Sequence, residues 1–201
     1  MQLGKVNGLY DCRPIVGELH LGEACKVKSL IENYDVPVGS LPKITFADIS
    51  SAALEIAEKN FAHLSFQELV RSRVTFVQTN LFEAVPYKFD FILTNPPYIP
   101  HSMVDSLLQD GRNEPRLALD GDITLLGDRA LAPDGSELDD GLEIIRNLLP
   151  QIKEHLNPYG SFLMETGEYN AVATSDLARS LGFRTTILKD LEGQLRVVEG
   201  I

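Results

Sequence analysis

Four consecutive residues, Asn95-Pro96-Pro97-Tyr98, have the chemistry to hold a planar amino group. The Asn95 side chain offers a carbonyl acceptor and an amide donor, and the backbone carbonyl of Pro96 offers a second acceptor beside it. Two acceptors aimed at one NH2 group fix its plane, and Tyr98 can stack on a flat substrate. This arrangement suits methyl transfer to a poorly nucleophilic nitrogen, such as an amide or the exocyclic amine of a base, because orientation supplies most of the help.

The alternative for these residues is an ordinary turn, since Pro-Pro commonly marks turns. The preceding run Phe89–Leu93 is aromatic or branched and predicts a buried strand. Pro96 and Pro97 lack amide hydrogens, so the strand must stop at Asn95 in an extended conformation. We therefore expect a stiff corner at the end of a strand. Asn95 and Pro96 are the predicted catalytic residues, and Pro97 and Tyr98 complete the predicted substrate site.

The elements that must position this corner alternate along the chain. Apolar runs predict strands at residues 44–47, 74–77, 89–94 and 161–164. Helical spacing predicts helices from Ser50 to Phe61, from Asp140 to Leu156 and from Ala171 to Leu181. Residues 184–188 and 195–198 predict a final hairpin that turns at Glu192-Gly193. The alternation indicates an α/β fold with a mostly parallel sheet and a C-terminal antiparallel hairpin.

Four polar residues follow the predicted parallel strands, namely Asp48, Asn80, Asn95 and Glu165. Ligands of parallel sheets bind outside the carboxyl ends of the strands, so these residues predict one convergent site. Asp48 is placed to accept the hydroxyls of a cofactor ribose, although it could instead complement the dipole of the next helix. Asn80 could bond an adenine edge or serve only as a turn residue. Glu165 is interpreted as mainly structural.

Composition limits the class of protein. The chain has 201 residues, 44% hydrophobic and 23% charged, which suits one globular core. Its net charge of −11 disfavours nucleic acid as a direct partner, because an acidic protein gains nothing from counterion release. No apolar run is long enough to span a membrane, and the first nine residues lack a signal-peptide core. Two cysteines and scattered histidines predict reduced thiols, a cytoplasmic location and no metal site.

Several motifs together resemble the peptide chain release factor glutamine methyltransferases. They are Phe89–Ile99, Asn113–Pro115, Ala118-Leu119, Asp140–Leu142, Asp190–Gly193 and Arg196–Val198. Asn-Pro-Pro-Tyr alone is shared with methyltransferases that act on adenine. Its combination with Glu114-Pro115 and Asp140-Gly141-Leu142 is much more specific, and the resemblance covers roughly residues 43 to 200.

The resemblance implies a class I, Rossmann-like methyltransferase fold and S-adenosylmethionine as the cofactor. It implies methyl transfer to the side-chain amide of the glutamine in the Gly-Gly-Gln loop of release factors. In this chain, Asn95 and the Pro96 carbonyl would orient that amide, and Pro97 and Tyr98 would shape the pocket. Asp48, Asn80 and Asn95 would contact the cofactor.

The sequence departs from that family in three places. Residues 22–30 contain one glycine where a glycine-rich cofactor loop should lie, about 20 residues before Asp48. We therefore expect residues 1–42 to be a degenerate N-terminal part with weak cofactor binding, and residues 43–201 to be the catalytic domain. The family usually carries Asp where this chain has Asn80. Residues 122–138 are inserted, and their turn chemistry predicts a solvated loop, with a lid or partner-binding role as the alternative.

Two other functions compete with the one that the resemblance implies. An adenine-directed nucleic acid methyltransferase would share Asn-Pro-Pro-Tyr, but the acidic charge and the lack of a basic recognition segment oppose it. A methyltransferase fold that binds a protein but no cofactor is supported only by the missing glycine-rich loop.

Overall fold

A computed structural model describes residues 42–62, 71–109 and 114–201. The strands are β1 (Ile44–Asp48), β2 (Val74–Gln78), β3 (Phe89–Thr94), β4 (Leu156–Glu165), β5 (Thr185–Lys189) and β6 (Leu195–Gly200). The helices are α2 (Ser51–Ala62), α4 (His101–Gln109), α5 (Glu143–His155) and α6 (Ala171–Ser180), with short 3-10 turns η2 (Arg71–Arg73) and η3 (Arg116–Ala118). The predicted α/β class is confirmed. The expected degeneracy of the first strand and cofactor loop falls on residues outside the described ranges.

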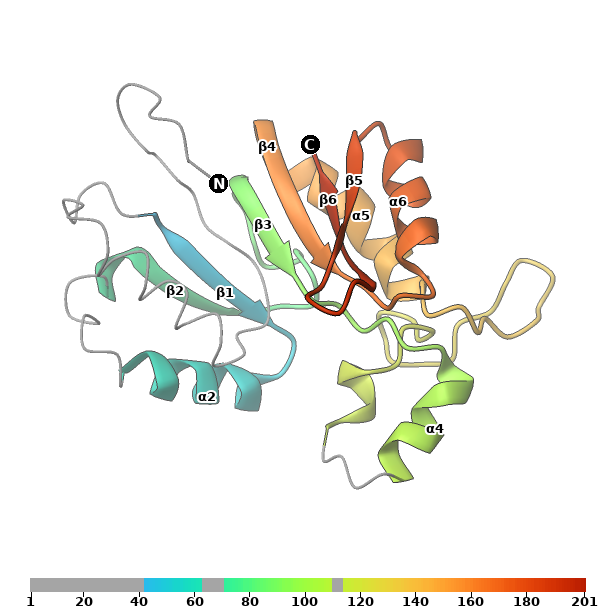
Figure 1. The fold of residues 1–201 in the computed structure, drawn as a ribbon. Coiled ribbons are helices and arrows are strands. Elements are labelled where there is room, and N and C mark those ends of the chain that lie inside the picture. The colour runs from blue at the N-terminus through green and yellow to red at the C-terminus, as the bar shows by residue number, and fades with distance from the viewer. Residues whose placement is uncertain (1–41, 63–70, 110–113) are drawn as a thin grey trace.

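The described strands form two sheets, whereas a single sheet was expected. β1 and β2 pair in parallel, and the second sheet has the order β3-β4-β6-β5. In the second sheet β3 and β4 are parallel, while β6 runs antiparallel to both of its neighbours, β4 and β5. The predicted C-terminal hairpin is therefore confirmed. Figure 1 shows the arrowheads of β1, β3 and β4 pointing the same way, so their carboxyl ends lie at one edge.

The main core lies between the mixed sheet and α5. Phe89, Ile92 and Phe162 of the sheet are fully buried, as are Ile145 and Ile152 of the helix. Their burial follows from strand alternation and from the helical spacing of the apolar residues in α5. α6 packs against α5 and against the hairpin strands (Figure 1). These layers enclose the buried side chains of β3.

The smaller sheet joins this core around Tyr87, just before β3. The Tyr87 hydroxyl lies 3.0 Å from Thr45 Oγ1 of β1, and its ring contacts Phe89 edge-on at 5.5 Å. Ala47 and Val77 also pack against the main core from β1 and β2. These contacts place the end of β1 beside the end of β3.

Residues 157–160, which follow the helix predicted to end at Leu156, lie within β4. The ladder pairs Phe89 with Leu156 and then Phe91 with Ser161, so four residues of β4 bulge out opposite one residue of β3. Tyr159 in the bulge is fully exposed and has a φ of 67°. The turn chemistry is present, and the strand accommodates it as an irregularity.

The inserted segment, residues 122–138, is not the simple solvated loop that its composition predicts. Asp122, Ile123 and Ala130 are buried, and isolated bridges join Ile123 to Arg129 and Leu131 to Glu137. Its middle is the expected turn, because Asp134 Oδ1 accepts hydrogen bonds from the Ser136 amide and hydroxyl. The segment is therefore anchored at its base and exposed at its tip.

Candidate active site

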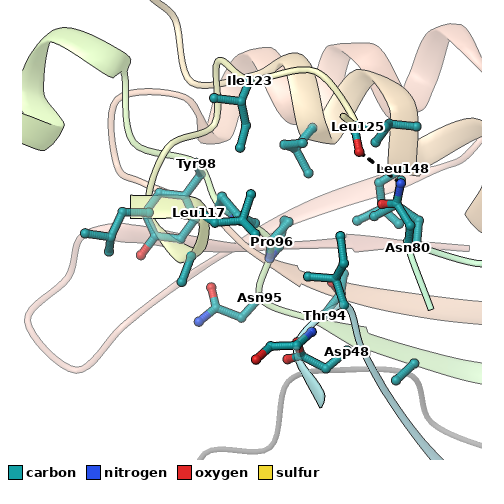
Figure 2. Close-up of a pocket in the computed structure, with 18 of the residues that line it drawn as sticks. Asp48, Asn80, Thr94, Asn95, Pro96, Tyr98, Leu117, Ile123, Leu125 and Leu148 are labelled. Carbon is teal, nitrogen blue, oxygen red and sulfur yellow. Dashed lines mark hydrogen bonds between the residues drawn. The ribbon is translucent and has the colours of Figure 1, made fainter. Parts of the chain in front are cut away.

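The carboxyl ends of β1 to β4 surround a pocket of about 710 Å3. Asp48, Asn80, Asn95 and Glu165 all line it, so the structure brings together the four residues that the sequence grouped. Figure 2 shows the first three of them. The wall between these polar groups is apolar and includes Leu81, Phe82, Leu117, Ile144 and Leu148. A pocket with mostly apolar walls and a few convergent polar groups is the usual form of a small-molecule site.

Asn95 follows the last residue of β3 and lines the pocket together with Pro96 and Pro97. Its Oδ1 atom is buried and has no hydrogen-bond partner within the described parts of the chain. A buried polar atom is normally paired, because an unmet acceptor costs about 1–3 kcal/mol. An unpaired acceptor on a residue that lines a pocket is suited to a ligand that brings its own N–H group.

Tyr98 is held at both ends. Its hydroxyl donates to Glu165 Oε1 at 3.4 Å, and its backbone carbonyl accepts a hydrogen bond from Asn170 Nδ2 at 2.8 Å. Burial, followed by the charge of Glu165, raises the pKa of the Tyr98 hydroxyl. Burial and the neighbouring Tyr98 raise the pKa of Tyr169 to about 12. Both phenols are therefore neutral at physiological pH and act as donors and flat apolar surfaces.

Asp48 ends β1 and serves the local structure as well as the pocket. Its Oδ1 accepts the Ser50 amide at 2.6 Å, and Ser50 Oγ in turn accepts the Ala53 amide at 3.2 Å, as expected for the N-cap of α2. Burial raises the pKa of Asp48, and the Ser50 amide opposes that rise. The carboxylate is thus fixed at the pocket edge.

Asn80 contacts the inserted segment. Its Nδ2 donates to the Leu125 carbonyl at 3.1 Å, the bond that is dashed in Figure 2, and lies 3.4 Å from Glu83 Oε1. Ile123 and Thr124 line the pocket beside Leu125. This wall was not predicted from the sequence. The only available signal was the apolar pair Ile123 and Leu125 within a polar segment.

An ionic cluster around the buried Asp120 supports the loop beyond Tyr98 and was not predicted from the sequence. Asp120 has no exposed surface, lies 2.5 Å from His101 Nδ1 and forms a 3.4 Å ion pair with Arg116. Arg116 also contacts Asp105 of α4. The cluster joins α4 to η3, next to the Glu114-Pro115 pair that lines the pocket. Across the described residues, no group of three or more His, Cys, Asp or Glu side chains is arranged to hold a metal ion.

Comparisons with known proteins agree with this geometry. Residues 38–132 match the family model described as the methyltransferase small domain. A release factor glutamine methyltransferase of Moorella thermoacetica is 36% identical over 157 residues, which cover 77% of this chain and 48% of that protein. A ribosomal protein uL3 glutamine methyltransferase of Bordetella pertussis is 33% identical over 126 residues, covering 62% of this chain and 36% of that protein.

Solved structures show the same fold at low identity. The glycopeptide N-methyltransferase MtfA complexed with S-adenosyl-L-methionine superposes with a TM-score of 0.56 at 14% identity, covering 98% of this chain and 88% of that one. This likeness supports the fold alone. The chain spans about half the length of the curated relatives it matches, such as that from Koribacter versatilis, at 35% identity and 49% of its length. In these matches, and in its Asn-Pro-Pro-Tyr corner, the chain is similar to the release factor glutamine methyltransferases.

Proposed function

We propose that the protein transfers a methyl group from S-adenosylmethionine to the side-chain amide of the glutamine in the Gly-Gly-Gln loop of peptide chain release factors. The observation that carries this proposal is the buried, unpartnered Oδ1 of Asn95, a residue that lines the pocket. A primary amide supplies the N–H group that this acceptor lacks. The family relationship supports glutamine as the side chain that bears the amide.

The residues of the corner have complementary roles in this reaction. Asn95 Oδ1 and the Pro96 carbonyl accept one N–H each, which holds the amide plane and turns the nitrogen toward the cofactor. The amide nitrogen is a weak nucleophile, so this orientation supplies the main acceleration. Pro97 and Tyr98 form the wall on which the substrate side chain packs.

The residues of the pocket fit S-adenosylmethionine. Asp48, half-buried at the end of β1, is placed to accept the ribose hydroxyls. Asn80 has its amide nitrogen directed at Leu125 and Glu83, so its Oδ1 remains to accept from an adenine amino group. When bound, the cofactor supplies an electrophilic methyl group on a sulfonium. The described chain supplies only binding, orientation and exclusion of water.

A second substrate is supported by a specific comparison. Relatives named ribosomal protein uL3 glutamine methyltransferase match this chain at 30% and 33% identity, near the range of the release factor enzymes. Both substrates present a glutamine amide, so the chemistry of the pocket serves either one. Release factor is the proposed substrate because most of the strongest matches act on it by name.

Transfer of tritium from labelled S-adenosylmethionine separates these possibilities. We expect label on a release factor and none on its variant with the loop glutamine replaced. Label on ribosomal protein uL3 alone would move the assignment to that substrate. Label on DNA or RNA would replace it with an adenine-directed activity, and no label on any acceptor would favour a fold that only binds a partner.

Asn95→Ala should abolish methyl transfer while the melting temperature stays close to that of the wild type, since Asn95 acts on the substrate and its Oδ1 makes no hydrogen bond within the described residues. Asn60→Ala on α2, outside the pocket lining, is the matched control and should retain activity. An Asn95→Ala protein with most of its activity would remove the role assigned to this residue.

A further inference from the structure

The inserted segment touches the pocket and the corner at the same time. Leu125 forms the wall beside Asn80, as described above. The segment folds back on itself, because the Ala130 amide donates to the Asp122 carbonyl at 3.0 Å and the Thr124 amide donates to the Asp128 carbonyl at 2.7 Å. Its first residue, Asp122, is therefore held in a fixed position and is fully buried.

The Asp122 carboxylate binds two backbone amides from different parts of the chain. The Gly141 nitrogen lies 2.8 Å from Oδ1 and 2.9 Å from Oδ2, and the His101 nitrogen lies 3.1 Å from Oδ2. Burial raises the pKa of Asp122, and the amide hydrogens of Gly141 and His101 oppose this rise. One side chain of the insertion thus ties the loop after Tyr98 to the loop before α5.

Gly141 in turn contacts the Tyr98 carbonyl directly. A Cβ atom on Gly141 would lie 2.1 Å from Tyr98 O and 3.1 Å from Pro100 N, so the two backbones touch. Asn170 Nδ2 donates to the same carbonyl at 2.8 Å. The Tyr98 peptide is therefore held by Gly141, by Asn170 and, through Gly141, by Asp122. We call this arrangement the Tyr98 clamp.

We propose that Asp122 is a positioning residue for methyl transfer, which the inserted segment contributes by fixing the Asn-Pro-Pro-Tyr corner through the Tyr98 clamp. The proposal rests on the proposed function, and it gives the insertion a role inside the site. A carboxylate suits this position because it is an acceptor only, and the two backbone groups that it binds, at Gly141 and His101, are N–H donors. In either orientation of an amide in its place, the NH2 group would lie against the Gly141 nitrogen, which is itself a donor, and would weaken that side of the clamp.

Kinetics of Asp122→Asn test this role. Misplacement of reacting groups by about 1 Å can cost on the order of 100-fold in rate, so we expect kcat to fall at least tenfold. The KM for S-adenosylmethionine should stay within about twofold, because Asp48 and the pocket wall are unchanged. Asp128→Asn is the matched control: its carboxylate is exposed in the same segment, and its kcat should equal that of the wild type.

A purely structural role would lower the melting temperature of Asp122→Asn without changing kcat per folded molecule. A folded Asp122→Asn enzyme with kcat within about twofold of the wild type would therefore overturn the proposal. If Asp122→Asn does not fold, Asp122→Ser replaces it, since the smaller side chain leaves room for water to satisfy the two amides. The same kinetic outcomes then decide.

Amide hydrogen exchange tests the clamp without any activity. Exchange at His101 and Gly141 should accelerate in the Asp122 variant and not in Asp128→Asn. Unchanged exchange at both amides would overturn the clamp even if the enzyme is active. A wild-type protein that methylates nothing would refute the proposed function, and the exchange comparison would still decide whether Asp122 holds the corner.

Discussion

The side chain of residue 80 forms a hydrogen bond with the inserted segment, and its chemical type decides whether that bond can form. Asn80 directs its amide nitrogen at two acceptors, the Leu125 carbonyl and Glu83 Oε1. A carboxylate at this position has no hydrogen to donate and would place negative charge against both oxygens. The amide at position 80 is therefore suited to a chain in which Leu125 forms part of the pocket wall.

Asn80→Asp should detach this wall from the end of β2. Losing the hydrogen bond to Leu125 and adding a charge beside Glu83 should lower the free energy of unfolding by about 1 kcal/mol, measured by urea denaturation. Asn60→Asp on α2 introduces the same charge away from the pocket and serves as the control. Equal stability of Asn80→Asp and the wild type would contradict the contact.

At the scale of elements, two glycines with left-handed backbones mark the ends of loops. Gly193 in the turn between β5 and β6 has a φ of 88°, and no atom lies within 4 Å of the site of a Cβ. Gly141, just before α5, has a φ of 68° and touches the Tyr98 carbonyl. Substitution at the first adds only backbone strain, whereas substitution at the second adds a steric clash as well.

Gly193→Ala should reduce the free energy of unfolding by about 1–2 kcal/mol, the cost of a left-handed residue with a side chain. Gly141→Ala should cost clearly more, because the Tyr98 and Pro100 backbones must move away. Chemical denaturation of the two variants in parallel gives the comparison. Equal losses would mean that the contact between Gly141 and Tyr98 is relaxed in solution.

The hairpin turn also predicts a pH dependence. The amides of Gln194 and Glu192 donate to Asp190 Oδ1 at 2.9 Å and 3.0 Å, and these bonds, led by Gln194, hold the pKa of Asp190 below its usual 3.8. A carboxyl with a depressed folded-state pKa stabilises the protein above its unfolded pKa and loses that contribution as pH falls through the folded value. Asp190→Ala should therefore destabilise the protein near neutral pH.

The difference between Asp190→Ala and the wild type should shrink as the pH is lowered below 3.8, which urea denaturation at several pH values would show. A difference independent of pH would show that the side chain acts through packing alone.

Sequence patterns predicted the helices and strands whose formation depends mainly on residues close together in the chain. The apolar runs of β1, β2 and β3 and the Ser50 cap of α2 require no knowledge of distant residues. The bulge at residues 157–160 and the helix α4 were not predicted. The bulge exists only because β3 pairs across it, and residues 101–109 take their anchorage from Asp120 and Asp122, which lie later in the chain.

At the scale of the whole molecule, the two sheets differ in how many partners their strands have and in how deeply their residues are buried. β4 has partners on both sides, β3 and β6, and it contributes the fully buried Phe162 and Met164. Within the described ranges β2 pairs only with β1, and none of its residues is fully buried. The sheets therefore contribute unequally to the stability of the fold.

Native-state amide exchange should reveal this difference. We expect residues 162–164 of β4 to exchange by global unfolding and residues 75–77 of β2 to exchange through a smaller local opening. Equal protection in both strands would indicate that the two sheets open as one unit.

The site was predictable to the extent that its residues follow strands. Asp48, Asn80, Asn95 and Glu165 could be grouped because the carboxyl ends of parallel strands meet at one edge. The wall formed by Ile123, Thr124 and Leu125 could not be predicted, because an inserted segment has no periodic pattern that fixes where it packs. Its placement depends on the partners of Asp122 and on Asn80, which only the folded chain brings together.

The order of the strands has a consequence for protein synthesis. β6 follows β5 in the chain, yet it lies between β4 and β5 in the sheet. While the ribosome is still making residues 195–200, β4 has an open edge and β5 has no strand to pair with. Open strand edges promote aggregation, so the nascent chain depends on rapid delivery of β6. A product truncated before Leu195 would keep that edge permanently and should be removed by proteases rather than accumulate.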